Sequence, residues 1–294
     1  MKKTSIKNQY KIFAIVSVVV LSIYAVSILF PLGWAILSSF KSRFDFRTNL
    51  FGLPKKWMWS NYWDSFSKLT IRVQAAEGGY NDVSFIKQLL NTIIITLVMT
   101  FVSVMSKLVP AYICAKYKCS FTRLMYQVNI IVMILPIMGT LASTLNVIHT
   151  LGIYDTLWVV ILLNSGFCGT DFLIYYAVYK GVSWEYAEAA QLDGAGHFLI
   201  FLKIMIPMAS STIFALSILS AISWWNNYDF NIMYLPSMPV LAFGLFRYQT
   251  SPAAGMTIPM QLAGAIVTSI PSITLFTVFR KKIMGNIAIG GLKG

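Results

Sequence analysis

Long apolar segments constrain this chain more than any other feature. They recur from one end to the other, at about 12–40, 85–115, 124–148, 156–179, 208–231 and 257–279. A helix needs about 20 apolar residues to cross the hydrocarbon core of a membrane. With 57% hydrophobic and 11% charged residues, the composition excludes an ordinary soluble domain. The sequence therefore predicts an all-α, polytopic membrane protein with about six transmembrane helices, forming a single transmembrane domain over residues 1–294.

The ends of the apolar segments predict how the chain is oriented. Basic residues gather in the N-terminal segment 1–11, at 116–123, at 180–203 and in the tail 280–294, whereas the short loops on the other side carry only Arg247. Lysine and arginine in short loops favour the cytoplasmic side. We therefore expect both termini and the loop 180–207 to be cytoplasmic. The net charge of +13 is spread over segment ends, so lipid headgroups are a simpler partner than nucleic acid.

The long hydrophilic loop 41–84 is itself basic and opposes this trend. The short loops agree with one another, however, and place this loop outside the cell membrane. Its tryptophans Trp57, Trp59 and Trp63 predict a folded or interface-lying loop rather than a flexible linker. The N-terminal apolar run is too long for a signal peptide and lacks a cleavage site, so we interpret it as a retained first span.

Residues that could carry an enzymatic reaction are few. There is no His-Glu-x-x-His, no Gly-x-Ser-x-Gly and no phosphate-binding Gly-x-x-x-x-Gly-Lys-Ser/Thr, so we expect no catalytic residue and no ATP site on this chain. The three cysteines Cys114, Cys119 and Cys168 are odd in number and form no Cys-x-x-Cys pair. They predict free thiols, with neither a disulfide framework nor a metal site.

A polar stretch at 183–207 interrupts the apolar pattern. Ser183 can cap a short helix whose first turn holds Glu185 and Glu188, and Gly194 can end it in a left-handed conformation. Alanines at 187, 189 and 190 leave one side of this helix nearly bare. We expect another protein to approach that side closely, with the Glu188 carboxylate available to a basic partner.

The same stretch resembles the EAA loop of bacterial ABC importer permeases. The residues that carry the resemblance and its coupling role are Glu188, Ala189, Ala190, Asp193, Gly194, Ile204 and Pro207. Ile206 stands where the family more often has leucine, which is a conservative change. The longer string through Asp193, followed by Phe198 and Phe201, is similar to the carbohydrate-uptake branch, the inner-membrane subunits of the maltose-transporter type.

This resemblance implies a type I ABC importer fold in the bacterial cytoplasmic membrane, with a cytoplasmic EAA coupling helix. The implied partners are a second homologous permease, two ATPase subunits that bind ATP and Mg, and an extracytoplasmic sugar-binding protein. The implied function is import of an oligosaccharide or other sugar by alternating access. Alternatives are an ABC permease for a non-sugar solute, an ATP-independent channel, or an intramembrane enzyme.

The end of the fifth apolar segment holds an aromatic and amide cluster that could line the substrate pathway. It consists of Trp224, Trp225, Asn226, Asn227 and Tyr228. Aromatic faces beside amides suit sugar rings and their hydroxyls, and Trp225-Asn226 resembles a Trp-Asn segment of the family. The alternative is an interfacial aromatic belt.

Two charged residues fall inside predicted spans. Lys107 can extend towards the cytoplasmic headgroups, or it can face the helix bundle and pair with Asp171. Asn91 and Thr92 at the start of the second span are expected to act in helix packing or capping. Pro110, Pro136, Pro259 and Pro271 are expected to let their helices bend.

Overall fold

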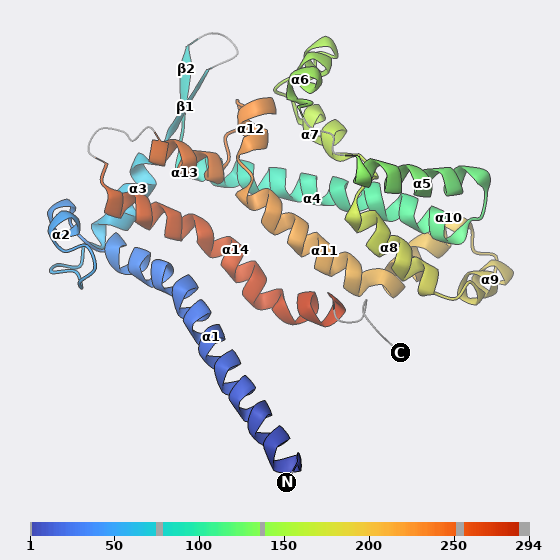
Figure 1. Ribbon diagram of the computed structural model, residues 1–294. Coiled ribbons are helices and arrows are strands. Elements are labelled where there is room, and N and C mark those ends of the chain that lie inside the picture. Colours follow the sequence, from blue (N-terminus) through green and yellow to red (C-terminus); the bar gives the residue numbers. More distant parts are fainter. Residues whose placement is uncertain (1, 75–78, 136–138, 251–255, 288–294) are drawn as a thin grey trace. The chain divides into compact units, whose positions relative to one another are not determined.

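The computed structural model describes residues 2–74, 79–135, 139–250 and 256–287, with side chains described over 11–73, 79–135, 139–250 and 256–281 (Figure 1). The C-terminal end of the predicted tail and Pro136 lie outside these residues. The chain forms two compact units, one comprising 1–69 and 247–268 and the other 70–246 and 269–294. We describe each unit by itself.

The first unit contains the long helix α1 (Lys2–Ser39), two short helices, α2 (Arg43–Thr48) and α3 (Ser60–Lys68), and the start of α14 (Ile258–Ile287). Helix α1 runs through Pro31 to Ser39 without ending at the proline. A proline in a helix removes one hydrogen bond, and the flanking turns can tolerate that loss.

The loop after α1 is folded, as its tryptophans predict. Lys41 is buried, and its Nζ donates hydrogen bonds to the carbonyl oxygens of Asn49 and Leu50 at 2.6 and 3.0 Å. Asn61 donates to the carbonyls of Ser39 and Lys41. The Phe40 ring lies 4.7 Å from the Trp59 ring. These contacts fix α2 and α3 against the end of α1.

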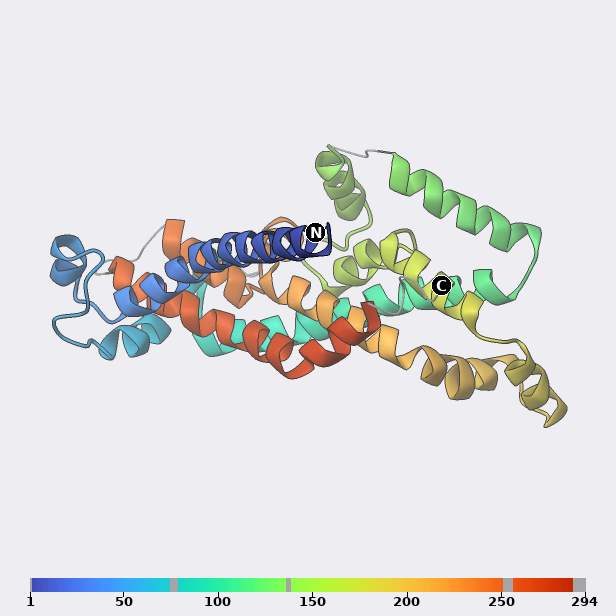
Figure 2. The ribbon, with the colours of Figure 1, turned by 60° about the horizontal axis from the view of Figure 1, so that its bottom comes forward.

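The second unit is built around α4 (Phe85–Lys116). Helices α7 (Leu157–Asn164), α8 (Thr170–Gly181) and α11 (Ile206–Asn226) pack along it, and Figures 1 and 2 both show α11 beside α4. Helix α4 buries polar side chains as well as apolar ones, among them Gln88, Asn91 and Thr92. This is typical of a helix whose polar groups face protein rather than lipid.

Two of the six predicted spans are not continuous helices. Within the described residues, the helices long and apolar enough to cross a membrane are Lys11–Ser39, Phe85–Lys116, His197–Asn226 and Ile258–Lys281. The predicted span 124–148 contains α5 (Ser120–Ile134) and α6 (Leu141–Thr150), and the predicted span 156–179 contains α7 and α8. The fold is thus a mostly helical polytopic membrane protein with four long apolar helices in its described part.

The break between α7 and α8 has hydrogen-bond partners on neighbouring helices. Asn129 of α5 accepts a hydrogen bond from the Gly169 N–H at 2.6 Å, and Asn164 donates to the Met99 carbonyl at 2.7 Å. Gly169 has a φ of +143°, which a residue with a side chain rarely adopts. Non-helical backbone is stable at membrane depth when neighbouring protein groups bind it in this way.

The prediction of an all-α chain is wrong at one place. Strands β1 (Ile71–Gln74) and β2 (Tyr80–Val83) pair antiparallel, with Ile71 opposite Val83. An ion pair of 3.1 Å between Arg72 and Asp82 joins opposing positions on their exposed side. The alternation of apolar Ile71 and Val73 with polar residues is the pattern of a strand.

Candidate functional site

The polar stretch forms the short helix α9 (Glu185–Leu192). Trp184 occupies the N-cap position that the sequence assigned to Ser183, and the Ser183 hydroxyl accepts a hydrogen bond from the Glu185 N–H at 3.3 Å. Glu185 and Glu188 lie in the first turn, as predicted. Their negative charges lie near the positive end of the helix dipole, and this attraction stabilises the start of α9.

Gly194 ends α9 in the left-handed conformation that the sequence predicts. Its φ is +83°, its N–H donates to the Gln191 carbonyl, and the Ala195 N–H donates to the Ala190 carbonyl, each at 2.9 Å. This pair of bonds is a Schellman motif, which satisfies the last carbonyls of a helix. A Cβ at Gly194 would meet no atom within 4 Å. Gly194 is therefore required for its backbone conformation and not for space.

The two sides of α9 differ in what they contact. Ala187 is fully buried, and Ala190 packs against the same cluster of apolar side chains from α4, α8 and α11. Glu188 and Ala189 are exposed. Of the three alanines, Ala187 and Ala190 therefore face the protein's own helices, and Ala189 faces outward.

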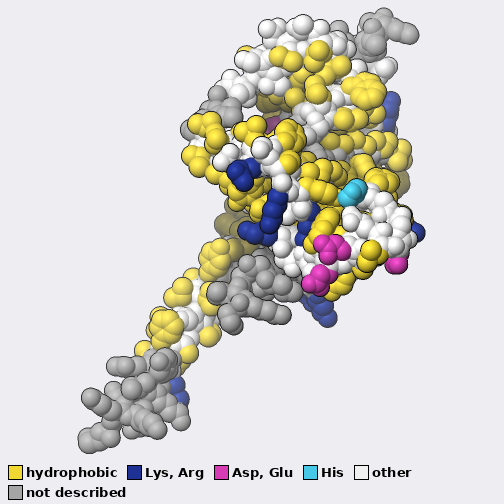
Figure 3. Space-filling model, turned by 90° about the vertical axis from the view of Figure 1, so that its right-hand side faces the viewer, with side chains coloured by type: hydrophobic (Ala, Val, Ile, Leu, Met, Phe, Trp, Pro, Cys, Tyr) yellow, Lys and Arg dark blue, Asp and Glu magenta, His cyan; other side chains and the backbone are white. Residues whose placement is uncertain are grey.

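The outward side of α9 carries an exposed stripe that we call the α9 stripe, at positions i, i+3, i+4 and i+7. It consists of Glu185, Glu188, Ala189 and Leu192. Leu192 is 90% exposed, which is unusual for a large apolar side chain within a charged surface. Figure 3 shows acidic side chains gathered at this end of the molecule, with apolar side chains beside them. An exposed apolar residue ringed by charge is typical of a protein contact.

The residues around α9 hold it firmly to the second unit. The Trp184 ring lies 5.7 Å from the Tyr117 ring, and the Tyr117 hydroxyl is 2.9 Å from Nδ1 of His197. Lys116, at the end of α4, donates a hydrogen bond to the Val182 carbonyl. Helix α9 is therefore attached to the end of α4 and to the end of α8. The sequence predicted neither the Tyr117–His197 contact nor the exposure of Leu192. A leucine within so polar a stretch could have indicated that exposure.

The chain returns to a helical conformation at His197, before the predicted loop 180–207 ends. Helix α10 (His197–Ile200), the π-helical turn η1 (Phe201–Met205) and α11 follow one another without interruption. Ile204 is partly buried in the apolar cluster and Pro207 is exposed. Proline has no N–H to donate, and the wider π turn before it avoids part of the clash that a proline ring makes inside a helix.

The predicted substrate-pathway residues have several structural contacts. Trp225 is buried, and Trp224 packs against Phe230 with ring centroids 5.6 Å apart. Tyr228 stacks on Phe246 at 4.7 Å.

The two asparagines of this group differ. The Asn227 side chain accepts from the Phe230 N–H, while Asn226 is exposed and donates to the Ile222 carbonyl and to the Ser272 hydroxyl. Asn226 is the member with the most accessible amide. A role of the five residues in the substrate pathway stays a prediction.

Lys107 extends away from the end of α4 that carries α9. Its Nζ donates to the carbonyl and the hydroxyl of Ser103, one turn back towards the middle of α4, at 3.2 and 2.9 Å. The expected extension towards the cytoplasmic headgroups is therefore wrong. Among the described residues Lys107 forms no ion pair within 4 Å with Asp171, which attracts it from a longer distance.

Known proteins share the sequence and the fold described above. Residues 75–281 match the family described as the binding-protein-dependent transport system inner membrane component. The chain belongs to this family. Such an inner membrane component is part of a transporter and not an enzyme. Among the described residues, no group of three His, Cys, Asp or Glu is placed to hold a metal ion.

Relatives of this inner membrane component cover nearly its whole length. It is 24% identical over 281 residues to a diacetylchitobiose uptake system permease protein of Streptomyces coelicolor, covering 95% of this chain and 88% of the relative. It is 23% identical to a probable starch degradation products transport system permease protein of Thermoanaerobacterium thermosulfurigenes, covering 94% of each.

A solved structure has the same fold. One chain of a bacterial ABC transporter involved in the import of the acidic polysaccharide alginate matches with a TM-score of 0.77 at 21% identity, covering 92% of this chain and 96% of that one. The fold is therefore that of an ABC importer permease.

Proposed function

We propose that this chain is one of two membrane subunits of a bacterial ABC importer that carries an oligosaccharide into the cytoplasm. The observation that carries the proposal is the α9 stripe, an outward-facing surface on a helix anchored to the main bundle. The sugar substrate is supported by relatives named for the uptake of diacetylchitobiose and of starch degradation products.

In this proposal α9 couples ATP hydrolysis to transport. The ATPase subunits bind ATP and Mg, and their closure pulls on the exposed stripe of Glu185, Glu188 and Leu192. Because the opposite side of α9 is packed on α4, α8 and α11, the pull reaches the spans as a rigid-body movement. The coupling surface also includes the motif residues Asp193 and Gly194, which end the helix.

The proposed topology completes this mechanism. Six membrane crossings, with the broken pairs α5–α6 and α7–α8 as the third and fourth, place both termini and α9 in the cytoplasm. The loop 41–84 and the strands β1 and β2 then lie outside, where a sugar-binding protein docks. A second homologous permease subunit closes the pathway, and Trp224 to Tyr228 lie near its outer mouth.

Paired substitutions at Gly194 test the role of α9. Gly194→Val forces a β-branched residue into a left-handed backbone, which costs about 1–2 kcal/mol or more, whereas Gly194→Asn tolerates that conformation. Co-purification of a tagged chain with its ATPases from the native host, and sugar uptake by the same cells, are measured together. We expect the valine variant to lose both and the asparagine variant to keep both.

A surface substitution gives an independent test with no change to the fold. Leu192→Ala removes an exposed side chain, so the protein inserts normally while ATPase binding falls; Leu199→Ala, at an exposed leucine outside the stripe, is the matched control. If Gly194→Val and Leu192→Ala both assemble with the ATPases and transport at the normal rate, α9 has no part in coupling.

The substrate class needs its own experiment. Uptake of radiolabelled oligosaccharides, a peptide and an inorganic anion is compared in cells with and without the gene. Loss of oligosaccharide uptake alone supports the proposal. Loss of peptide or anion uptake alone would identify a permease for a different solute.

A further inference from the structure

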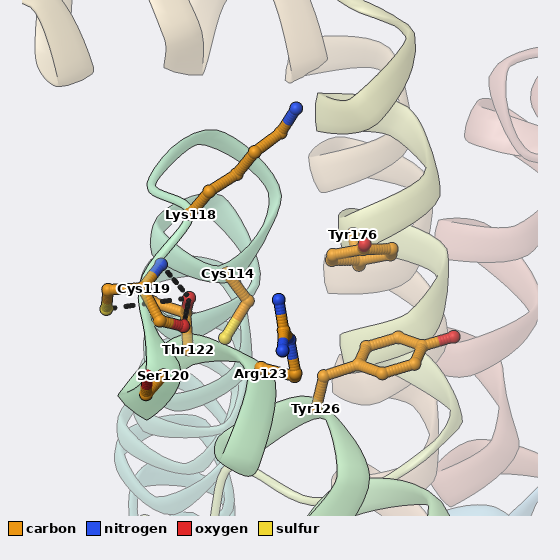
Figure 4. A pocket seen from close by; sticks show the side chains of 8 residues that line it. All are labelled: Cys114, Lys118, Cys119, Ser120, Thr122, Arg123, Tyr126 and Tyr176. Atoms are coloured by element: carbon orange, nitrogen blue, oxygen red, sulfur yellow. Dashed lines mark hydrogen bonds between the residues drawn. The ribbon is translucent and has the colours of Figure 1, made fainter.

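A cavity lies at the same end of the second unit as α9, and its lining contains no residue of the α9 stripe. It has a volume of about 370 Å³ and lies between the end of α4, the start of α5 and the middle of α8 (Figure 4). Lys118 and Arg123 supply its cationic side chains, and Tyr126 and Tyr176 form one wall. The two tyrosine rings are 4.8 Å apart.

The two cations of this cavity have no ion-pair partner among the residues that the structure describes. Both Lys118 and Arg123 are exposed, and within the described part of the chain no carboxylate lies within ion-pair distance of either. Neighbouring Lys116, by contrast, binds the Val182 carbonyl. A third cation, Lys180, lies 5.9 Å from the centre of the Tyr176 ring. Two cations therefore line this tyrosine-walled space, and Lys180 adds a third positive charge near one of its tyrosines, which together favour an anion.

The start of α5 adds to this attraction. Ser120 and Thr122 of its first turn line the cavity, so the positive end of the dipole of a 15-residue helix borders the same space as the cations. Arginine and lysine beside a helix N-terminus are the groups that bind phosphate oxygens. The anion that fits is a phosphate ester.

The apolar surface of α5 indicates which phosphate ester this is. Ile130 and Ile134 follow Arg123 along one line of the helix, at i+7 and i+11, and Ile134 is 74% exposed. Along this line the charge of Arg123 is followed by polar Gln127 and then by the half-buried Ile130 and the exposed Ile134 towards the other end of α5. A phospholipid has the same order, with a phosphate at the membrane surface and acyl chains below it.

We propose that this cavity binds the phosphate group of an anionic phospholipid, with the acyl chains running along Ile130 and Ile134 of α5. In the orientation proposed above, the lipid belongs to the cytoplasmic leaflet and lies next to α9. The site links the start of α5 to α4 and α8, the helices on which α9 is packed. Lipid bound there stabilises the end of the bundle that the ATPases move.

Native mass spectrometry of the purified full-length chain tests the site. Dioleoylphosphatidylglycerol is titrated against dioleoylphosphatidylcholine, and bound lipid is counted for the wild type and for K118Q/R123Q. We expect the wild type to prefer the anionic lipid and the double variant to lose about tenfold of that preference. K203Q/R280Q removes two exposed charges elsewhere and is expected to bind within about twofold of the wild type. Equal loss in both variants, or no loss in either, overturns the proposal.

Alkylation of Cys119 separates lipid from free phosphate. Cys119 lines the cavity and is exposed, so an occupant slows its reaction with N-ethylmaleimide. Rates are compared in phosphatidylglycerol nanodiscs, in phosphatidylcholine nanodiscs, and in the latter with inorganic phosphate. Slowing by phosphatidylglycerol alone, absent in K118Q/R123Q, supports the lipid. Equal slowing by inorganic phosphate would assign the site to a soluble anion. This test needs no transport activity, so its failure would leave the proposed import function standing.

Discussion

The two ends of α4 are held in different ways. At the end near α9, the Tyr112 ring contacts the rings of Tyr179 and Phe201 with centroids 5.3 and 4.9 Å apart. At the other end, the Asn91 side chain donates to the Pro239 carbonyl at 3.0 Å, and the Thr92 hydroxyl accepts from the Leu241 N–H at 2.9 Å. The end near α9 packs mainly through aromatic rings, with a hydrogen bond from Lys116 to the Val182 carbonyl beside them, whereas the other end bonds its neighbour through buried polar side chains.

The two kinds of contact differ in how easily they allow one helix to shift relative to another. Ring packing depends weakly on direction, so small sliding of one helix over another costs little, as in a shear movement. Hydrogen bonds weaken steeply with distance and angle, so they hold α4 in register with the segment before α13 (Leu241–Thr250). The end that carries the proposed coupling helix therefore relies more on ring packing than the other end does, and we expect it to tolerate small shifts more easily.

The largest expected effect comes from removing a ring at the α9 end. Tyr179 is fully buried, and Tyr179→Ala is expected to lower the free energy of unfolding by about 3–5 kcal/mol because it leaves a large cavity. Thermal unfolding in detergent, followed by circular dichroism, measures this.

The matched control for this change is Tyr179→Phe. Among the described residues the buried Tyr179 hydroxyl has no hydrogen-bond partner, so its removal is expected to be neutral or stabilising. A strong loss of stability in Tyr179→Phe would show that this end, too, depends on directional bonds.

At the hydrogen-bonded end, Asn91→Leu is expected to cost about 1–3 kcal/mol because the buried Pro239 carbonyl loses its donor. The same exchange at the exposed Asn146 of α6 is expected to change stability by less than about 0.5 kcal/mol. The same unfolding assay applies. Equal effects at the two positions would remove the distinction between the ends of α4.

A smaller effect is expected from Tyr117→Phe, which removes the hydroxyl that contacts His197. This pair is exposed, so its loss is expected to cost about 0.5–1.5 kcal/mol of stability. If α9 is held mainly by packing, ATPase binding survives this change. Complete loss of ATPase binding in Tyr117→Phe would instead make the hydrogen bond essential.

The smallest effect is on the reactivity of Cys119, at the turn between α4 and α5. Hydrogen bonds from the backbone and the side chain of Thr122 lower the pKa of the Cys119 thiol below its ordinary value, so its thiolate, and with it alkylation, persists to lower pH than in a free thiol. Thr122→Val is expected to move the midpoint of the rate-against-pH curve upward. A midpoint that stays unchanged would show that the Thr122 side chain does not contribute and that the backbone hydrogen bond of residue 122 is sufficient.

Labelling the same thiol tests the proposed orientation. An impermeant maleimide is expected to reach Cys119 in inverted vesicles and not in intact cells, because the turn is proposed to be cytoplasmic. Labelling in intact cells would reverse the topology and place α9 outside.

The sequence predicted the parts of this fold that depend on local chemistry. The bounds of α1 and α4 follow from hydropathy, and the end of α9 follows from Gly194, because a left-handed cap is a property of one residue. The identity of the coupling surface was only partly predicted: the motif gave Glu188, while the outward position of Leu192 depends on how α9 packs.

The breaks in the predicted third and fourth spans depend on tertiary contacts. Gly166 and Gly169 signal a possible break, but a hydropathy average over 156–179 conceals them. The non-helical segment is bonded by Asn129 of α5 and Ser106 of α4, and the Asn164 side chain at the end of α7 donates to the Met99 carbonyl of α4. The direction of Lys107 likewise depends on Ser103. No pattern along one helix contains that information.

The π turn η1 has a consequence for the direction in which α9 faces. A π turn holds one more residue than an α turn, and each residue of an α-helix corresponds to a rotation of about 100°. Deleting Leu202 would restore regular α-helical winding between His197 and Pro207 and turn everything before it by roughly that angle relative to α11. The extra residue thus sets the rotation of α10 relative to α11, and with it the direction in which the chain runs from α10 back through the turn at Gly194 to α9.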